Sequence, residues 1–216
     1  MFPWLSHMLN VWRSSAQPAR SARFAMLGLL MFATTAAAQA PAPSPPMSGE
    51  APVLFGLLFP DTISGFKRGN VTNYETDHPG LGDGVKYSSN GWSIDVYIYD
   101  DGLKNIPDSL SSELVTAQFA QARGDIHSIQ QSRSGKVEDG ETFQISSPTN
   151  TARFTCESFL IVDTSSHQID SFLCLTAWHG KFVKYRLSTL HNDGSTAIAK
   201  RFVGAWADQL WPASGR

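Results

Sequence analysis

Residues 92–99 place the strongest constraint on the fold, because their side chains alternate strictly between two kinds. The apolar set is Trp92, Ile94, Val96 and Ile98, and the set between them is Ser93, Asp95, Tyr97 and Tyr99. Successive side chains of a β-strand point to opposite faces of its sheet. The segment therefore predicts a strand with one face on a core, and Asp95, Tyr97 and Tyr99 are expected on the opposite face.

Two segments show the spacing of amphipathic helices. The first spans residues 110–129 and follows Pro107, Asp108 and Ser109, residue types that start helices. Its apolar positions are Leu110, Leu114, Val115, Phe119, Ala122, Ile126 and Ile129. The second helix follows a capping segment at 192–195, and its apolar stripe is Ile198, Phe202, Trp206 and Leu210.

Between the two predicted helices, the chain reads as a series of strands. They are expected at residues 142–146, 153–162, 169–178 and 181–190. Ahead of both helices, the apolar residues 53–60 suit a short strand or a loop against the core. His179 and Gly180 form a two-residue turn signal between the last two strands. The order of strands, helix, strands, helix predicts an α+β fold, an antiparallel sheet with one mid-chain and one C-terminal helix packed on it.

The N-terminal residues have the three parts of a secretory signal peptide. A basic lead with Arg13, Arg20 and Arg23 precedes an apolar run at 24–38, which ends in small residues. A retained membrane anchor is the alternative, but this run falls short of the roughly 20 apolar residues that a spanning helix needs. We expect cleavage after residue 38 and a periplasmic or secreted protein.

This interpretation divides the chain into four parts. They are a signal peptide at 1–38, a Pro-rich leader at 39–52, a single α+β domain at 53–211 and a tail at 212–216. Removing residues 1–38 takes away three of the 17 Lys and Arg residues and none of the 19 Asp and Glu residues, which leaves a net charge of about −5. We therefore expect no nucleic-acid partner, and no membrane span after signal cleavage.

The only two cysteines, Cys156 and Cys174, both lie in the part predicted to be exported. An even pair in an oxidising compartment favours a disulfide over two free thiols. If residues 163–168 form the loop of a hairpin centred on Ser165, Cys156 lies opposite Cys174. Opposed antiparallel residues have Cα atoms roughly 4.5–5.5 Å apart, which is within disulfide range.

The layout resembles the PsbP-like fold, an α/β sandwich, over about residues 60–211. Three segments carry the resemblance: residues 136–143, residues 178–188 and the closing helix at 198–210. The chain also looks similar to small secreted proteins of proteobacteria through residues 79–82 and 96–102. The PsbP-like family is mostly non-enzymatic and includes extrinsic photosystem subunits and periplasmic proteins. None of that family's functional residues can be matched here.

The sequence contains none of the common catalytic motifs, such as a Gly-x-Ser-x-Gly elbow, a phosphate loop or a His-Glu-x-x-His run. Neighbouring turns hold Glu75, Asp77, His78, Asp83, Asp100 and Asp101. These side chains could bind a divalent cation, but acidic residues also favour turns and solvent, which is the interpretation we adopt. We predict no catalytic, cofactor-binding or metal residues.

Asp95, Tyr97 and Tyr99 are the candidate binding surface, provided that no helix covers their face and makes them part of the core. We predict an exported, non-enzymatic binding or accessory protein of the cell envelope, whose partner is an unknown small ligand or envelope protein. The alternative is a hydrolase or metal-dependent enzyme whose site assembles only in three dimensions.

Overall fold

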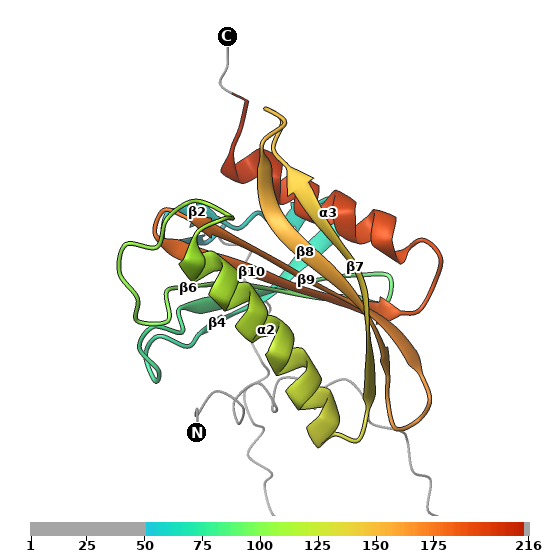
Figure 1. The fold of residues 1–216 in the computed structure, drawn as a ribbon. Helices are drawn as coiled ribbons and strands as arrows, with labels where there is room; N and C mark the ends of the chain where they lie inside the picture. The colour runs from blue at the N-terminus through green and yellow to red at the C-terminus, as the bar shows by residue number, and fades with distance from the viewer. Residues whose placement is uncertain (1–50, 214–216) are drawn as a thin grey trace, which may run out of the picture. The chain divides into compact units, whose positions relative to one another are not determined.

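The computed structural model describes residues 51–213 and shows a large antiparallel sheet with two helices (Figure 1). This confirms the predicted α+β class. The predicted signal peptide and nearly all of the Pro-rich leader lie outside the described residues. Within residues 51–213, neither helix combines the length and the apolar character needed to cross a bilayer.

The main sheet has eight strands in the order β3-β4-β5-β6-β10-β9-β8-β7, and β1 and β2 form a separate small hairpin. The elements are, in chain order, β1 (Val53–Leu54), β2 (Leu57–Leu58), β3 (Thr62–Ile63), β4 (Phe66–Asn73), β5 (Asp83–Ser89), β6 (Trp92–Tyr99), α2 (Glu113–Ser132), β7 (Lys136–Ser146), β8 (Ala152–Val162), β9 (Gln168–Trp178), β10 (Lys181–Leu190) and α3 (Ser195–Leu210).

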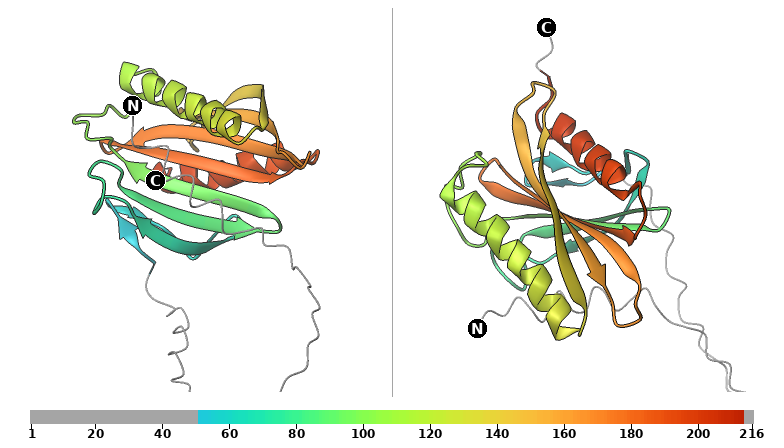
Figure 2. Two further views of the ribbon diagram at one scale, coloured as in Figure 1. Left: turned by 90° about the horizontal axis from the view of Figure 1, so that it is seen from below. Right: turned by 45° about the vertical axis from the view of Figure 1, so that its right-hand side comes forward.

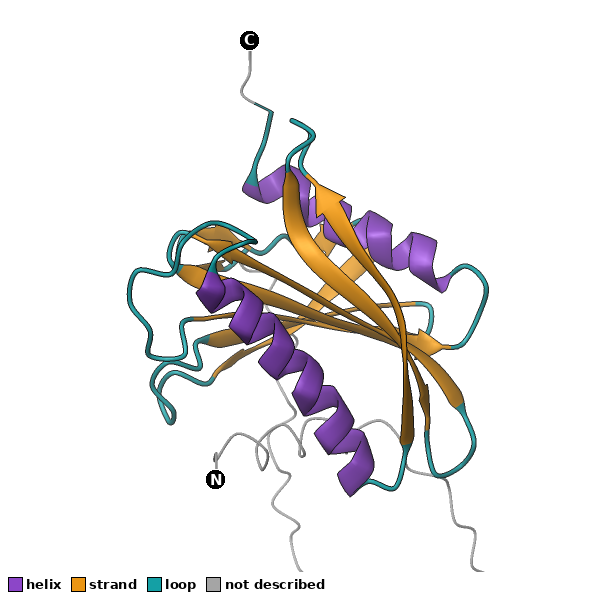
Figure 3. Cartoon of the chain, viewed as in Figure 1, coloured by secondary structure: helices purple, strands orange, loops and turns teal. Residues whose placement is uncertain are grey.

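The helix α3 covers one face of the sheet and encloses the main core (Figures 2 and 3). Phe202 and Trp206 of α3 pack edge-on or tilted against Tyr87 of β5 and Tyr185 of β10, with ring centroids 5.9–6.3 Å apart. All four side chains are fully buried. Aromatic burial of this extent provides a large share of the stability of such a domain.

The helix α2 lies on the opposite face and covers only part of it. Ala122 and Ile126 of α2 pack on Phe159, Ile161 and Leu173, which belong to β8 and β9. The same face of β4, β5 and β6 therefore lies to one side of the helix. The alternating strand β6 sends its apolar set to the α3 core and its polar set to this partly covered face.

The strand pairing confirms that the two cysteines lie opposite each other, with a Cα separation slightly shorter than expected. Cys156 pairs with Cys174 across β8 and β9, and the two residues form a disulfide with a Cα–Cα separation of 4.1 Å. His179 and Gly180 both have positive φ, at 50° and 74°, as the tight turn between β9 and β10 requires.

The largest differences from the predicted boundaries are at α2, which spans residues 113–132 rather than 110–129, and at the start of β7. The helix α2 begins at Glu113, with Ser112 as its N-cap, because the Ser112 hydroxyl accepts a hydrogen bond from the Val115 amide at 3.2 Å. The strand β7 begins at Lys136 rather than at residue 142, and a bulge interrupts its pairing between Asp139 and Thr142. The exposed, charged start of this edge strand has no apolar alternation that could reveal it.

Candidate functional site

Polar side chains of β6, β10 and α2 meet on the partly covered face of the sheet. The register places Lys184 of β10 directly opposite Tyr97 of β6, and Arg186 opposite Asp95. Lys184 and Arg186 are two residues apart on one strand, so both side chains point to the same face. This pairing brings two cations next to Asp95 and Tyr97 of the predicted binding surface. We call these four residues the Lys184–Arg186 site.

The helix α2 forms one wall of this site. The Gln118 side-chain amide donates a hydrogen bond to the Tyr99 hydroxyl at 3.0 Å, and both side chains are buried. Asp125 follows Gln118 by seven residues, which is about two helical turns, so it lies on the same side of α2. Asp125 is half-buried and interacts electrostatically with both Lys184 and Arg186.

Lys184 is the most unusual residue of the site, because its side chain is buried with only 5% relative exposure. Its Nζ lies 5.1 Å from the centroid of the Tyr97 ring and 5.2 Å from that of Tyr99. Among residues 51–213, no carboxylate forms an ion pair with it. Burial and the neighbouring Arg186 lower the pKa of Lys184 to about 8.

Arg186 is likewise incompletely paired. Its Nη2 donates a hydrogen bond to the Ser171 hydroxyl at 2.9 Å, but its buried Nε has no hydrogen-bond acceptor in the described part of the chain. Burial lowers the pKa of Arg186 to about 10, against the opposing effects of Tyr97 and Asp95. A buried donor without a partner destabilises the fold unless a ligand or water satisfies it.

Three carboxylates surround the cations without reaching either at ion-pair distance. Burial raises the pKa of Asp95, Asp101 and Asp125, although Lys184 or Arg186 lowers each of them in part. The Asp95 carboxylate lies 3.7 Å from the ammonium of Lys86, its partner on β5. Perturbed titratable groups of both signs gathered in one place are typical of a functional site.

An aromatic pair borders the site on the side away from α2. The rings of Tyr74 and Tyr97 have centroids 6.4 Å apart. Gly84 lies beside them, and a Cβ atom at this position would approach the Tyr74 ring to 2.9 Å and the Tyr97 ring to 3.4 Å. Glycine at position 84 thus leaves room for the two tyrosine rings on the open part of the face.

The predicted binding residues share one face but differ in exposure. Asp95 and Tyr97 are half-buried, while Tyr99 is buried at 2% exposure and hydrogen-bonds to Gln118 of α2. Tyr99 therefore belongs to the packing of the helix, and Tyr97 remains part of a surface. The sequence analysis missed Lys184 and Arg186, although they alternate with the apolar Val183, Tyr185 and Leu187.

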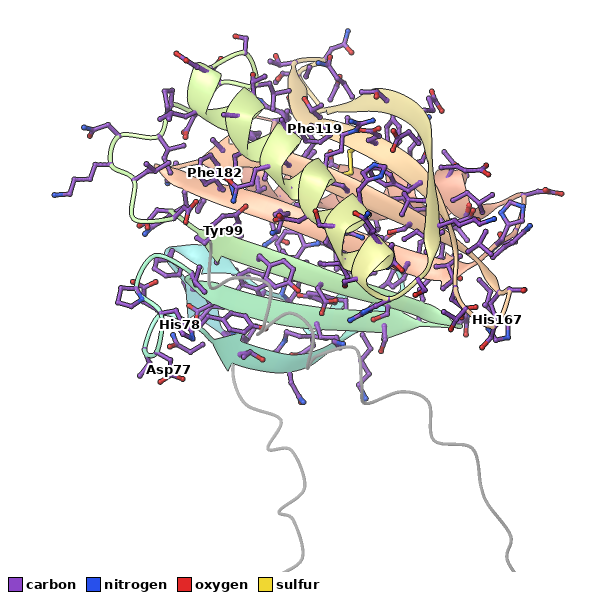
Figure 4. All side chains as sticks on the ribbon, turned by 60° about the horizontal axis from the view of Figure 1, so that its bottom comes forward. Asp77, His78, Tyr99, Phe119, His167 and Phe182 are labelled. Carbon is purple, nitrogen blue, oxygen red and sulfur yellow. A yellow bond between two sulfur atoms is a disulfide. The ribbon has the colours of Figure 1, made fainter. Side chains whose placement is uncertain are left out.

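The acidic turns at residues 75–83 and 100–101 lie side by side, because the Gly80 carbonyl accepts hydrogen bonds from the Asp100 and Asp101 amides. The Glu75 carboxylate accepts hydrogen bonds from the Gly80 and Gly82 amides, at 3.0 and 2.9 Å. Asp77 and His78 lie at one end of the sheet and His167 at the other (Figure 4). Asp100 pairs with Lys181 at 2.6 Å. Among residues 51–213, no group of three or more His, Cys, Asp or Glu side chains is placed to hold a metal ion. The prediction that the chain has no metal or cofactor stays a prediction.

Comparisons with known proteins show similarity to solved structures. No protein-family model matches the chain, and no curated protein matches it. The solution structure of cyanobacterial PsbP (CyanoP) from Synechocystis sp. PCC 6803 is similar to it, with a TM-score of 0.45 and 12% sequence identity, over 71% of this chain and 96% of that one. The expected similarity to secreted proteins of proteobacteria stays a prediction.

Proposed function

We propose that the chain is an exported, non-enzymatic binding or accessory protein of the cell envelope, and that the Lys184–Arg186 site binds an anionic group of its ligand. The observation that carries this proposal is the burial of the Lys184 ammonium without an ion-pair partner within residues 51–213. A bound oxyanion would supply the missing counter-charge to Lys184 and an acceptor for the Nε of Arg186.

The residues around the two cations indicate the chemical nature of the rest of the ligand. Tyr97 is half-buried and Tyr74 stands next to it, so a flat apolar part can pack on these rings while its anionic group faces β10. The fork of an arginine side chain suits a carboxylate or a phosphate. We therefore expect a small organic anion with a planar part.

Calorimetric titration of the purified protein with benzoate tests this proposal, with inorganic phosphate as a second probe that lacks the planar part. Benzoate is expected to bind more tightly than phosphate, because only benzoate can use the tyrosine rings. Benzyl alcohol keeps the ring without the charge and is expected to show no saturable binding.

Two variants and a control test whether benzoate binds at the Lys184–Arg186 site. Lys184→Met and Arg186→Gln should each weaken benzoate binding by about tenfold or more, as the loss of one charged contact implies. Lys67→Met is the matched control, because Lys67 is an exposed lysine on β4. Equal affinity in the wild type and in both site variants would rule out the site.

The alternative is an enzyme. Its support is the group of side chains with shifted pKa values around Lys184, since such groups are common in active sites. Asp101 is the discriminating residue, because it is a carboxylate of raised pKa near the cations. An Asp101→Asn variant that melts at the wild-type temperature but loses a measured turnover would establish the enzyme. If Asp101→Asn binds benzoate as the wild type does and neither protein shows turnover, the result supports a binding protein.

A further inference from the structure

A second site lies toward the β7 edge of the sheet, up to three strands away from β10 and Lys184. The loop before α2, the β7–β8 hairpin, the end of β9 and the residue after α3 enclose an open cleft of about 270 Å³. Its lining includes Asp108 and Ser109 of the loop, Gln144 of β7, Arg153 of β8 and Trp211. A cleft of this size accommodates a small molecule or a short segment of one.

Arg153 is held in place by an aromatic platform. Its guanidinium carbon lies 4.8 Å from the centroid of the Trp211 ring. Trp211 in turn packs edge-on against the buried Phe154, with ring centroids 5.8 Å apart, and its backbone amide donates a hydrogen bond to the Ala207 carbonyl at 3.0 Å. Stacking of this kind fixes the guanidinium plane while leaving its N–H groups free to bind.

The donors of Arg153 have no acceptor within residues 51–213. Its Nε is buried without a hydrogen-bond partner, and no ion pair joins its guanidinium to a carboxylate of that range. Arg123 shows the usual arrangement for comparison, because its Nε donates to the Glu157 carboxylate at 3.0 Å. A stacked arginine with free donors in a cleft is arranged to bind a planar oxyanion.

The other side chains of the cleft indicate which class of anion it binds. Neutral donors and acceptors line it, among them the Gln144 amide and the Ser109 and Ser111 hydroxyls, which lie 3.1 Å apart. Asp108 contributes one negative charge, which repels a phosphate dianion more than a singly charged carboxylate. The mixture therefore favours a carboxylate attached to amide or hydroxyl groups.

We propose that this cleft is a binding site for the carboxylate of a small amide- or hydroxyl-bearing molecule, in which Arg153 holds both carboxylate oxygens. Gln144 and the serine hydroxyls hydrogen-bond to the polar part of the ligand. The inference does not depend on the Lys184–Arg186 site, since the two groups share no residue.

A nuclear magnetic resonance titration with N-acetylglycine tests this proposal, followed through the indole N–H signal of Trp211. N-acetylglycinamide is the matched neutral probe, because it replaces only the carboxylate by an amide. We expect a saturable shift of the Trp211 signal with N-acetylglycine and at least a tenfold weaker response to N-acetylglycinamide. Equal responses to the two probes would overturn the proposal.

Variants of two arginines complete the test. Arg153→Lys keeps the charge but loses the fork and the stacking, and should weaken N-acetylglycine binding by about tenfold or more. Arg201→Lys is the control, because Arg201 is an exposed residue of α3 outside the cleft, and it should bind like the wild type. Unchanged affinity in Arg153→Lys, or tighter binding of inorganic phosphate than of N-acetylglycine, would contradict the assignment.

Discussion

Replacing Lys184 by methionine should stabilise the protein at neutral pH. Methionine keeps the length and apolar character of the buried stem and removes only the ammonium. The pKa of Lys184 falls from 10.5 to about 8 in the folded protein, and one pKa unit corresponds to about 1.4 kcal/mol, so burying the charge costs about 3 kcal/mol below pH 8. Removing a buried charge that has no ion-pair partner within residues 51–213 recovers part of this free energy.

The pH dependence of the free energy of unfolding is a second, independent test of whether the Lys184 ammonium destabilises the folded protein. Between pH 8 and 10.5, the unfolded chain keeps the Lys184 proton and the folded protein has lost it, so the contribution of this residue to stability increases with pH. The advantage of Lys184→Met over the wild type should therefore be largest below pH 8 and shrink through this window.

Urea unfolding at several pH values measures both effects. Lys184→Met is expected to raise the free energy of unfolding at pH 7 by roughly 2–3 kcal/mol, while the exposed control Lys67→Met changes it by less than about 0.5 kcal/mol. A Lys184→Met variant that is less stable than the wild type at pH 7 would show the opposite, namely that the neighbours of the ammonium stabilise it in the folded protein.

Three further predictions follow from the packing and from the sequence. Reduction of the Cys156–Cys174 bond, which joins residues 18 apart, should lower the free energy of unfolding by about 3 kcal/mol, and thiol titration of the denatured, unreduced protein should find no free thiol. Tyr99→Ala should destabilise the buried start of α2 by about 3–5 kcal/mol, whereas Tyr97→Ala should mainly weaken benzoate binding, as melting curves beside calorimetry can distinguish. N-terminal sequencing of the mature protein should find Gln39 first, and a chain that still carries residues 1–38 would contradict the predicted export.

The sequence predicted the fold well where a face of an element is buried. The alternation at 92–99 and the turn at His179 and Gly180 fix strand direction and length, and the expected pairing of Cys156 with Cys174 matches the observed register. The start of β7 could not be predicted, because an exposed edge strand leaves no apolar pattern.

The site was predictable only in part. Alternation assigned Asp95 and Tyr97 to the face away from the main core, but no local signal shows which strand lies next to β6. That neighbour is β10, more than 80 residues later in the chain, and it brings Lys184 and Arg186 to the site. The burial of Tyr99 depends on where α2 crosses the sheet, which is a property of tertiary packing.

The titration of Lys184 is the sharpest test of whether the Lys184–Arg186 site binds an anion. Nuclear magnetic resonance can follow the side-chain Nζ of Lys184 from pH 6 to pH 11, first without an added ligand and then with saturating benzoate. We expect a pKa of about 8 without ligand and a clear upward shift with benzoate, because a bound anion stabilises the ammonium. A pKa at the ordinary value of 10.5 in the free protein, or one that saturating benzoate leaves unchanged, would contradict this expectation.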